Sequence, residues 1–371
     1  MIKVLFFIHD LGQGGAEKVL VNLVNNMDRE KFDITLISLF GGGVNEQFLS
    51  SDIKHKSIFK KAFPGNSHLM KLFSPAFLHK LFIKEIYDIE VSYLEGPSAR
   101  IISGCPNKNT KLVSWIHCTQ STKKQIATGF RSFAELRNCI KKFNKIIFVS
   151  RDIEKIYKKI LPNIKSEVLY NTNDSEYIIN ASKELPDNSF DSNEFNIISI
   201  GKVAKIKGFN RLANAHCRLK TDGYNIHTYI IGSGNNEYQS EITKTLKNFS
   251  DENSFTFLGF KKNPYKYLAR ANLFVCSSYS EGFSTAATEA LILGIPVVTT
   301  EVAGMREMLG ESNEYGIITE NNEDALYCGI KSLLDDKSLL EHYKKQAQIR
   351  GKDFIVNKTV TAVENMLLNL E

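Results

Sequence analysis

Short apolar runs alternate with amphipathic stretches along most of the chain, and they form two successive series. Apolar runs that end at turn residues are typical of strands, and apolar residues spaced three or four apart are typical of helices. In the first series the pattern predicts strands over residues 3–8, 32–38, 89–94, 111–116 and 145–150. It predicts helices over 16–27 and 129–142, with another helix after Ser150. In the second series it predicts strands over 195–200, 226–231, 254–259, 272–277 and 295–300, and helices over 207–221, 237–249, 263–270 and 285–293.

Alternating strands and helices of this length predict parallel sheets that are covered by helices on both faces. Two such series predict an α/β protein of two doubly wound, Rossmann-like domains, over residues 1–175 and 190–352. A polar stretch without apolar runs, residues 171–194, is expected to connect them, and the chain beyond about residue 323 is expected to be helical. A length of 371 residues also fits two domains better than a single core.

Composition indicates an ordinary globular protein, with 43% hydrophobic and 24% charged residues. No apolar run approaches the roughly 18 residues of a membrane span. The N-terminal run MIKVLFFIHD is too short for a secretory signal, and no small-residue cleavage site follows it. The six cysteines are scattered without a C-x-x-C pair. This spacing favours reduced thiols in a cytoplasmic protein over disulfides or structural zinc.

The basic excess is confined to the first half of the chain. Residues 1–190 carry 27 Lys and Arg against 19 Asp and Glu, whereas residues 191–371 carry 20 against 22. Residues 54–84 hold seven lysines, no acid and five interleaved phenylalanines, and residues 111–145 hold eight basic residues against one acid. This pattern favours an anionic membrane surface, where each basic residue contributes about 1 kcal/mol. There are two alternatives. One is binding of nucleic acid, which we do not expect as a partner. The other is an A+T-rich genome, which favours Lys and Phe throughout the chain.

Ligands of doubly wound domains bind at the carboxyl ends of the strands, so the loops after strands are the candidate sites. The loop HDLGQGGAEKVL (9–20) lacks the third glycine of a dinucleotide fingerprint, because Glu17 stands there. Gly14 and Gly15 nevertheless open a helix, where the backbone can approach a ligand, or they serve only a tight turn. His117 follows the strand over 111–116 and is expected to face the crevice, unless it is a satisfied structural histidine.

The loop SIGKVAKIKGFNRL (199–212) places two cations at a strand end just before a helix. Lys202 and Lys207 are therefore expected to clamp a diphosphate, and the alternative is two solvated lysines in a lysine-rich chain. Further candidate contacts to the ligand are Gly201, Gly232, Gly234, Phe260 and Lys261. The alternative is that these are ordinary loop residues without a ligand.

The stretch EGFSTAATEALILGIPVV (281–298) places two carboxylates around small and apolar residues. Ser284 or Thr285 is expected to cap a helix that ends at Gly294, which puts Glu281 in the preceding loop and Glu289 inside the helix. The free backbone N–H groups of the first helical turn form a phosphate site between the two acids, because they have no partner within the helix. The residues expected to contribute to it are Gly282, Phe283, Ser284 and Thr285.

These motifs together resemble the retaining glycosyltransferases of the GT-B fold, of the family 4 type. The resemblance rests on Glu281 and Glu289 with seven residues between them, on GKVAKIKG (201–208), GSG (232–234), the Gly14–Gly15 loop and His117, and it covers essentially the whole chain. It departs from the family at Lys202, where many members have arginine, and in the loop FSTAAT, where FGL-type sequences are commoner.

The resemblance implies two domains with a cleft between them and a nucleotide-sugar donor bound mainly to the second. Glu289 would hold the ribose hydroxyls, Lys202 and Lys207 the diphosphate, and Glu281 the donor sugar, while His117 and Gly15 would complete the site. Gly14 and His117 would lie on the acceptor side. The final helix, about 353–371, would pack back on the first domain. No D-x-D carboxylate pair stands in a suitable loop, so we expect transfer without a metal or other cofactor.

The expected function is transfer of a hexose or N-acetylhexosamine, with a UDP-sugar favoured, to a saccharide that we expect to be lipid-linked. The expected location is the inner face of the cytoplasmic membrane, as a peripheral protein. A nucleotide-sugar 2-epimerase of the same fold is one alternative, and it predicts no dependence on an acceptor. A non-catalytic partner subunit of another transferase is the other, and such a subunit usually loses one of the clamp residues.

Overall fold

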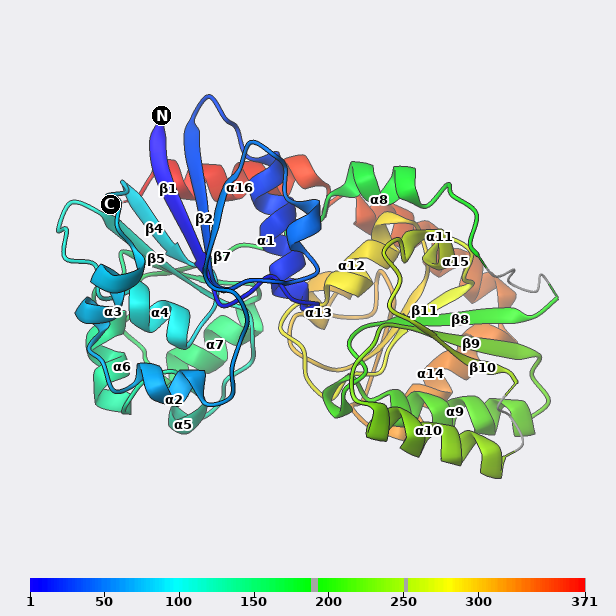
Figure 1. Ribbon diagram of the computed structural model, residues 1–371. Helices are drawn as coiled ribbons and strands as arrows, with labels where there is room; N and C mark the ends of the chain where they lie inside the picture. Colours follow the sequence, from blue (N-terminus) through cyan, green and yellow to red (C-terminus); the bar gives the residue numbers. More distant parts are fainter. Residues whose placement is uncertain (188–192, 250–252, 371) are drawn as a thin grey trace. The chain divides into compact units, whose positions relative to one another are not determined.

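The computed structural model describes residues 1–187, 193–249 and 253–370, and the chain divides into two compact units (Figure 1). Unit 1 comprises Met1–Thr172 and the C-terminal residues from Asn357 onward, and unit 2 comprises Asn173–Val356. Each unit is a parallel sheet with helices on both faces, as the alternation of elements predicted (Figure 1). The α/β class and the two doubly wound sheets are thereby confirmed.

The sheet of unit 1 has seven strands in the order β3-β2-β1-β4-β5-β6-β7, and every pairing is parallel. The strands are β1 (Ile2–Ile8), β2 (Phe32–Phe40), β3 (Lys54–Phe59), β4 (Ile89–Ser92), β5 (Lys111–Ile116), β6 (Lys145–Phe148) and β7 (Ser166–Val168). The edge strands β3 and β7 were not predicted. Each pairs on one side only and is polar and partly exposed, so neither shows the apolar run of a buried strand.

The helices of unit 1 are α1 (Gly15–Asn26), α2 (Asn66–Met70), α3 (Pro75–Phe82), α4 (Pro97–Ile102), α5 (Lys123–Ile126), α6 (Phe133–Ile140), α7 (Arg151–Ile160) and α16 (Val356–Leu368). The helix predicted over 129–142 is shorter, because the Ser132 hydroxyl accepts from the Glu135 N–H at 3.1 Å and caps α6 there. From Asn357 onward α16 belongs to this unit, and Glu364 Oε1 accepts from the Asp28 N–H at 2.6 Å.

The sheet of unit 2 has six parallel strands in the order β10-β9-β8-β11-β12-β13. The strands are β8 (Phe195–Ile200), β9 (Ile226–Ile231), β10 (Phe255–Gly259), β11 (Leu273–Cys276), β12 (Val297–Thr300) and β13 (Ile317–Thr319), the last an edge strand that was not predicted. The helices are α8 (Ser175–Ala181), α9 (Phe209–Thr221), α10 (Asn236–Asn248), α11 (Tyr265–Leu268), α12 (Thr285–Ile292), α13 (Met305–Leu309), α14 (Glu323–Asp335) and α15 (Lys337–Gly351).

The prediction of a linker over residues 171–194 is wrong for residues 173–187, which belong to unit 2. Asp174 caps α8 by accepting from the Tyr177 N–H at 3.0 Å, and Ile178 and Ala181 are buried against Tyr265 of α11. Residues 173–187 are therefore an integral part of unit 2. Residues 188–192 of the expected linker lie outside the described residues.

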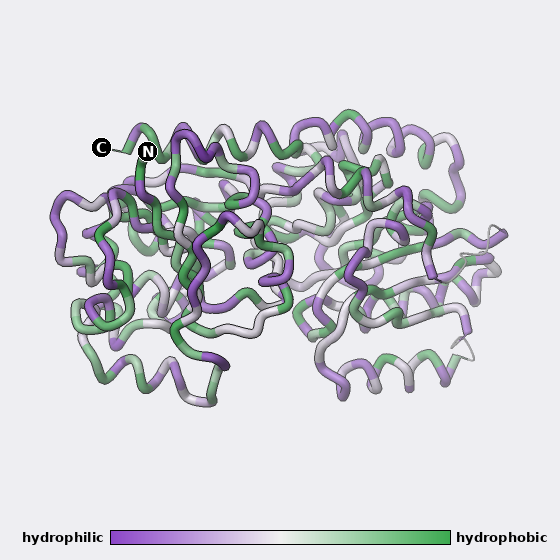
Figure 2. The backbone as a smooth tube through the Cα atoms, turned by 45° about the horizontal axis from the view of Figure 1, so that its top comes forward, coloured by the Kyte–Doolittle hydropathy of each residue, from purple (hydrophilic) through white to green (hydrophobic). Residues whose placement is uncertain are grey.

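Hydropathy follows this layered arrangement (Figure 2). The helices are banded hydrophilic and hydrophobic along their length, as expected of elements with one face against a sheet. The strands β4, β11 and β12 are buried along their whole length. Among the described residues, every helix is too short or too polar to span a bilayer.

Both sheets reverse strand order at one place. In unit 1 the reversal lies between β1 and β4, and in unit 2 between β8 and β11. Chain connections leave these neighbouring strands toward opposite sides, which opens a crevice outside their carboxyl ends. The loops at these two places are therefore where ligands are expected.

Candidate functional site

In unit 2 the loops after β8 and β11 are packed against each other at the point where the strand order reverses. Lys205–Lys207 form a single 3-10 turn, and Gly208 after it has a φ of 64°. A Cβ on Gly208 would lie 2.0 Å from the Ser277 carbonyl oxygen, so only glycine permits this approach. The Ser277 hydroxyl also donates to the Lys207 carbonyl at 2.9 Å.

This packing brings together two of the predicted site residues. The Lys207 ammonium lies 2.7 Å from Glu281 Oε1, and the Ser278 hydroxyl donates to the same oxygen at 2.5 Å. Both charged side chains are largely buried, with 26% of Lys207 and 11% of Glu281 exposed. Burial and the Glu281 carboxylate raise the pKa of the neighbouring Cys276 thiol, which therefore stays protonated. The result is a cation and an anion held side by side at the carboxyl ends of β8 and β11.

Lys202, the other member of the predicted clamp, is placed differently. Its side chain is exposed and forms no ion pair with any other described residue. The structure therefore brings Lys207, but not Lys202, into an ion pair with Glu281.

The glycines of the neighbouring loops permit close backbone packing. A Cβ on Gly232 would lie 1.9 Å from the Gly201 carbonyl oxygen, and one on Gly234 would lie 2.3 Å from that of Val203. The Val203 N–H donates to the Ser233 carbonyl at 3.0 Å. The loops after β8 and β9 thus lie side by side, and the GSG sequence is explained by this contact alone.

Helix α12 begins beside Glu281. Of the two predicted caps, Ser284 is the N-cap, since its hydroxyl accepts from the Ala287 N–H at 3.3 Å, and Thr285 is the first helical residue. The Phe283 side chain is buried and contacts Phe354. The Gly282 carbonyl packs closely against Gly304, where a Cβ would lie 2.8 Å from its oxygen.

Glu289 lies in the second turn of α12, as predicted, and only 2% of it is exposed. Its Oε1 accepts from the Tyr265 hydroxyl at 3.2 Å. A buried carboxylate of this kind is costly unless it is hydrogen-bonded, which explains the tyrosine. The adjacent Thr288 accepts from the Asn173 side chain at 2.8 Å, which ties α12 to the start of unit 2.

Two of the further candidate contacts, Phe260 and Lys261, lie in the loop after β10. Phe260 is exposed, whereas the Lys261 ammonium lies 3.6 Å from Asp187 and 5.4 Å from the centre of the Tyr267 ring. Lys266 and the Tyr267 hydroxyl lower the pKa of Asp187 to about 2. Lys261 thus has an ion-pair partner that the sequence did not predict.

In unit 1, His117 follows β5 and is almost fully buried. Its ring packs 4.9 Å from that of Tyr93, and its Nε2 finds no hydrogen-bond partner among the described residues. Burial lowers the pKa of His117 to about 3, so the imidazole is neutral. A buried ring nitrogen without a partner is unusual in a folded protein and can accept a hydrogen bond from a ligand or donate one to it.

Glu95 is a site residue that the sequence reasoning missed. It lies in the loop after β4, where the strand order reverses, and its Oε2 accepts from the His117 backbone N–H at 3.0 Å. Burial raises the pKa of Glu95. The strand-end rule that singled out His117 applies equally to Glu95, which directly follows the predicted strand over 89–94.

The glycine loop of unit 1 differs from the anion site that it resembles. Gly14 is the N-cap of α1 and Gly15 its first residue. The Glu17 carboxylate folds back over this turn, since a Cβ on Gly14 would lie 1.9 Å from Glu17 Oε2. A carboxylate already occupies this helix start, so it suits a hydroxyl-bearing ligand better than a phosphate.

Arg211 of α9 is a second missed residue, and it supports the loop that carries Glu281. Its guanidinium lies 3.7 Å from the centre of the Tyr279 ring, and its Nη1 donates to Asn321 at 2.8 Å. Only 2% of Arg211 is exposed, and burial lowers its pKa. No sequence pattern distinguishes it from the other basic residues of this helix.

Two doubly wound parallel sheets, with a lysine–glutamate pair where the strand order of the second reverses, define the class of GT-B glycosyltransferases. Residues 13–177 match the model of the family described as "Glycosyltransferase Family 4", and residues 180–350 match that of "Glycosyl transferases group 1". The chain therefore belongs to the glycosyltransferases of this two-part family.

Relatives match over nearly the whole length. The chain is 30% identical over 381 residues, 95% of this chain and 96% of the relative, to the N-acetylgalactosamine-N,N'-diacetylbacillosaminyl-diphospho-undecaprenol 4-alpha-N-acetylgalactosaminyltransferase of Campylobacter jejuni. It is 25% identical to the O-antigen biosynthesis glycosyltransferase WbnH of Escherichia coli, over 99% of this chain and 100% of that protein. The Anabaena Alr3699/HepE structure with UDP and glucose has the same fold, with a TM-score of 0.82 and 19% identity over 100% of both chains.

Proposed function

We propose that the protein transfers a hexose or N-acetylhexosamine from a nucleotide sugar, with a UDP-sugar favoured, to a saccharide acceptor in capsule, O-antigen or exopolysaccharide synthesis. The observation that carries the proposal is the Lys207–Glu281 pair beside the start of α12. The names of the Campylobacter and Escherichia relatives support the class of acceptor, and the UDP complex of the Anabaena protein supports the donor base.

The Lys207–Glu281 pair suits sugar transfer because a nucleotide-sugar donor carries a group that can bind each of the two side chains. The diphosphate would replace Glu281 as the counter-ion of Lys207, and the first N–H groups of α12 would bind the same phosphates. Glu281 would then accept a hydrogen bond from a hydroxyl of the donor sugar. Glu289 is assigned to the ribose hydroxyls by resemblance, and Lys202 is free to approach the diphosphate from solvent.

In the reaction, the bond between the anomeric carbon and the diphosphate oxygen breaks, and a bond from the acceptor hydroxyl oxygen to that carbon forms. The acceptor proton passes to the departing diphosphate. We propose that attack occurs on the face from which the diphosphate leaves, which retains the configuration. Lys207 stabilises the charge that develops on the leaving group, and no metal ion is required because this cation and the helix start supply the stabilisation.

Unit 1 contributes the acceptor side of the proposal. The neutral His117 imidazole offers Nε2 to a sugar hydroxyl, and Glu95 holds the His117 backbone in place through its 3.0 Å hydrogen bond. Gly14 and Gly15 allow a saccharide to approach the backbone at the start of α1.

A lipid-linked acceptor is supported by an apolar surface on α2, α3 and the turn between them. Its members are large, exposed and apolar: Leu69, Leu72, Phe73, Phe77 and Leu81. Leu72 is 72% exposed, and the Phe73 and Phe77 rings stack with their centres 5.1 Å apart. Large apolar side chains exposed together on one segment mark an interaction site. Exposed lysines lie close to it in the sequence, namely Lys60, Lys61, Lys80 and Lys84. Apolar side chains among lysines match an anionic lipid surface.

The surface is held in a fixed shape by two arginines. Arg100 donates to the Met70 carbonyl at 2.9 Å and to the Phe73 carbonyl at 2.6 Å, and Arg131 donates to the Leu72 carbonyl at 2.8 Å. The Met70 carbonyl also accepts from the Phe73 N–H at 3.3 Å, so backbone and arginine donors together fix the turn. The apolar side chains are thus presented on a preorganised support, from which we propose peripheral attachment to the inner face of the cytoplasmic membrane.

Two details of the predicted basic–aromatic face are corrected. Phe82 is buried and does not reach a membrane, and Lys54 is paired with Asp33 at 2.7 Å. Phe59 and Phe63 pack on Phe40, which leaves only part of each exposed. Within the predicted face of residues 54–84, we therefore propose the α2–α3 surface as the membrane contact.

A thermal-shift panel of nucleotide sugars, followed by an acceptor-dependence assay, tests the proposed function. We expect one UDP-sugar to raise the melting temperature more than its competitors, and UDP to accumulate only when a saccharide acceptor is added. Release of UDP without an acceptor, or conversion of the donor to an epimer, would contradict transfer. Stabilisation by a GDP-sugar alone would correct the donor base and leave the reaction class standing.

A further inference from the structure

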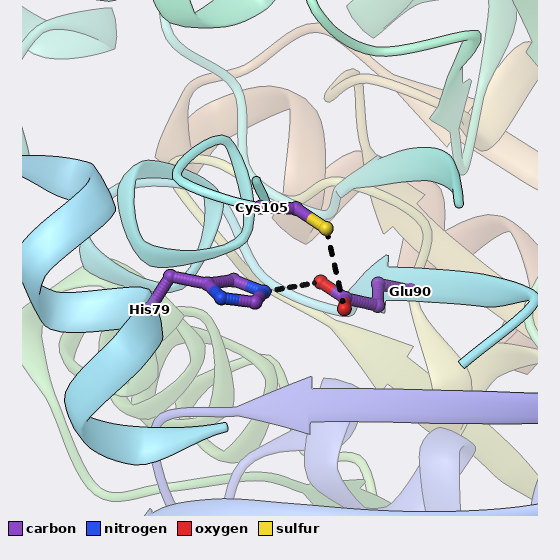
Figure 3. Close-up of side chains that lie close together, drawn as sticks. All are labelled: His79, Glu90 and Cys105. Atoms are coloured by element: carbon purple, nitrogen blue, oxygen red, sulfur yellow. Dashed lines mark hydrogen bonds and ion pairs between the residues drawn. The ribbon is translucent and has the colours of Figure 1, made fainter. Parts of the chain in front are cut away.

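A buried cluster in unit 1 combines the three donor types that bind zinc. His79 of α3, Glu90 of β4 and Cys105 in the turn after α4 point toward one another (Figure 3). Their nitrogen, oxygen and sulfur atoms all lie within 4.8 Å of one another. His79 Nε2 lies 2.8 Å from Glu90 Oε2, and the Cys105 sulfur lies 3.5 Å from Glu90 Oε1.

The cluster is separate from the proposed transfer site. In the register of β4 and β5, Ser92 lies opposite Ser114. His117 is therefore five residues further along the strands than Glu90, a separation of about 16 Å at ~3.3 Å per residue. The transfer chemistry proposed above uses none of the three residues, and the present inference does not depend on it.

Packing that is independent of the cluster places its members. Gly104 lies directly against the start of α3, where a Cβ would meet the Pro75 carbonyl oxygen at 2.1 Å. This contact fixes the neighbouring Cys105 beside the helix that carries His79. On the other side of Cys105, the Thr110 hydroxyl donates to the Tyr87 carbonyl at 2.7 Å and closes the turn onto the sheet. The three donors are thus preorganised by the backbone.

Among the described residues, His79 is the only basic side chain within ion-pair distance of Glu90. Glu90 is only 1% exposed and His79 only 4%, and no Lys or Arg among the described residues forms an ion pair with Glu90. A buried carboxylate is costly without a compensating cation. A divalent cation bound by one carboxylate, one thiolate and one neutral imidazole would give a group of zero net charge, which suits a buried position.

We propose that His79, Glu90 and Cys105 bind a Zn²⁺ ion that fastens α3 to the sheet of unit 1. Mixed nitrogen, oxygen and sulfur ligation in a tetrahedral set is characteristic of zinc, whereas calcium and magnesium require oxygen donors. Cys105 is only partly buried, so an ion would enter from its side, and a water from solvent would be the fourth ligand. The bound ion would stabilise the helix that carries the α2–α3 surface.

The test uses the full chain, purified without metal-affinity resin and stripped with a chelator. Zn²⁺ is titrated against a chromophoric chelator, and Co²⁺ is used as a spectroscopic substitute. We expect about one equivalent of tight zinc, a thiolate-to-cobalt absorption band, and a higher melting temperature with zinc than without. Cys105→Ser and His79→Gln should each weaken zinc binding by roughly 100-fold or more and remove the thermal shift, since each deletes a direct ligand.

The matched control is Cys328→Ser, which removes an exposed cysteine of unit 2 and should leave zinc affinity and the cobalt band unchanged. Circular dichroism of both ligand variants establishes that they are folded. A folded Cys105→Ser protein that binds zinc as tightly as the parent would overturn the proposal, as would the absence of zinc binding by the parent. In the second case the cluster is a hydrogen-bonded triad in which the imidazole and the thiol both donate to Glu90.

Discussion

Replacing Lys207 is the sharpest test of the proposed transfer site. The ammonium lies 2.7 Å from Glu281, and at this distance an effective dielectric constant of about 20 gives roughly 6 kcal/mol of gross attraction. Desolvation of both groups offsets most of it, so the pair by itself contributes little to folding. Its arrangement is explained better by a ligand, because a diphosphate can take the place of the carboxylate.

The expected effect follows from the charge that Lys207 would supply as the nucleotide leaves. Removing one preorganised electrostatic donor costs about 3 kcal/mol of transition-state stabilisation, or roughly 10²-fold or more in kcat/KM. We expect this loss for Lys207→Ala and for Lys207→Met, which keeps most of the aliphatic stem. Lys207→Arg keeps the charge and should lose less, about tenfold, since its planar fork cannot reproduce the position of a single ammonium.

Lys205→Ala is the matched control for this series. Lys205 belongs to the same turn, but it is 77% exposed and its nearest acid, Glu241, is 3.9 Å away. We expect its kcat/KM to stay within about twofold of the parent. Initial rates of UDP release with acceptor present measure the effect, and thermal melting checks that each variant is folded.

A second measurement separates leaving-group stabilisation from simple support of Glu281. Isothermal titration with UDP should show much weaker binding to Lys207→Met, because the diphosphate loses its cation. Glu281→Gln should bind UDP within a few fold of the parent but lose kcat/KM, because its role is with the sugar. Full activity in Lys207→Met, or equal loss of UDP affinity in both variants, would refute this assignment.

The remaining predictions concern the metal requirement, the membrane and pH. Transfer in excess EDTA should stay within a few fold of the untreated rate; abolition by EDTA with rescue by Mg²⁺ or Mn²⁺ would refute metal-independent transfer. Replacing Lys60, Lys61 and Lys80 by Gln should weaken co-sedimentation with anionic liposomes, whereas the same change at the three lysines of α15 should not. Binding should also fall as salt shortens the Debye length from about 10 Å at 0.1 M to about 3 Å at 1 M, and equal binding to neutral liposomes would contradict it. Burial lowers the pKa of His117 and of His216 to about 3, so below pH about 6.5 only the unfolded chain takes up their protons. The free energy of unfolding should therefore fall by about 1.4 kcal/mol per histidine for each pH unit between about 6.5 and 3, and urea titrations that are flat between pH 7 and pH 5 would exclude this linkage.

The sequence by itself determined the class of fold and which loops follow the central strands. Buried parallel strands are nearly continuous apolar runs, so β1, β2, β4, β5 and their counterparts in unit 2 are visible without a structure. The strands β3, β7 and β13 lacked that signal, because β3 is polar and partly exposed and β7 and β13 are only three residues long, whereas the edge strand β10 (FTFLG) is apolar and was predicted. The strand-end rule located His117, Lys207 and Glu281, because parallel strands deliver their following loops to one edge of the sheet.

Only the tertiary structure decided which of these side chains meet. Lys207 and Glu281 are 74 positions apart in the chain, and their contact depends on a glycine that lets the loops after β8 and β11 touch. Whether Lys202 or Lys207 would be the buried cation was not encoded in either residue's neighbours. The zinc-type cluster has the same origin: its cysteine belongs to no short motif, because its partners come from a helix and a strand that precede it. Local pattern reports which face of an element is apolar, whereas distances between elements are set by how the whole core packs.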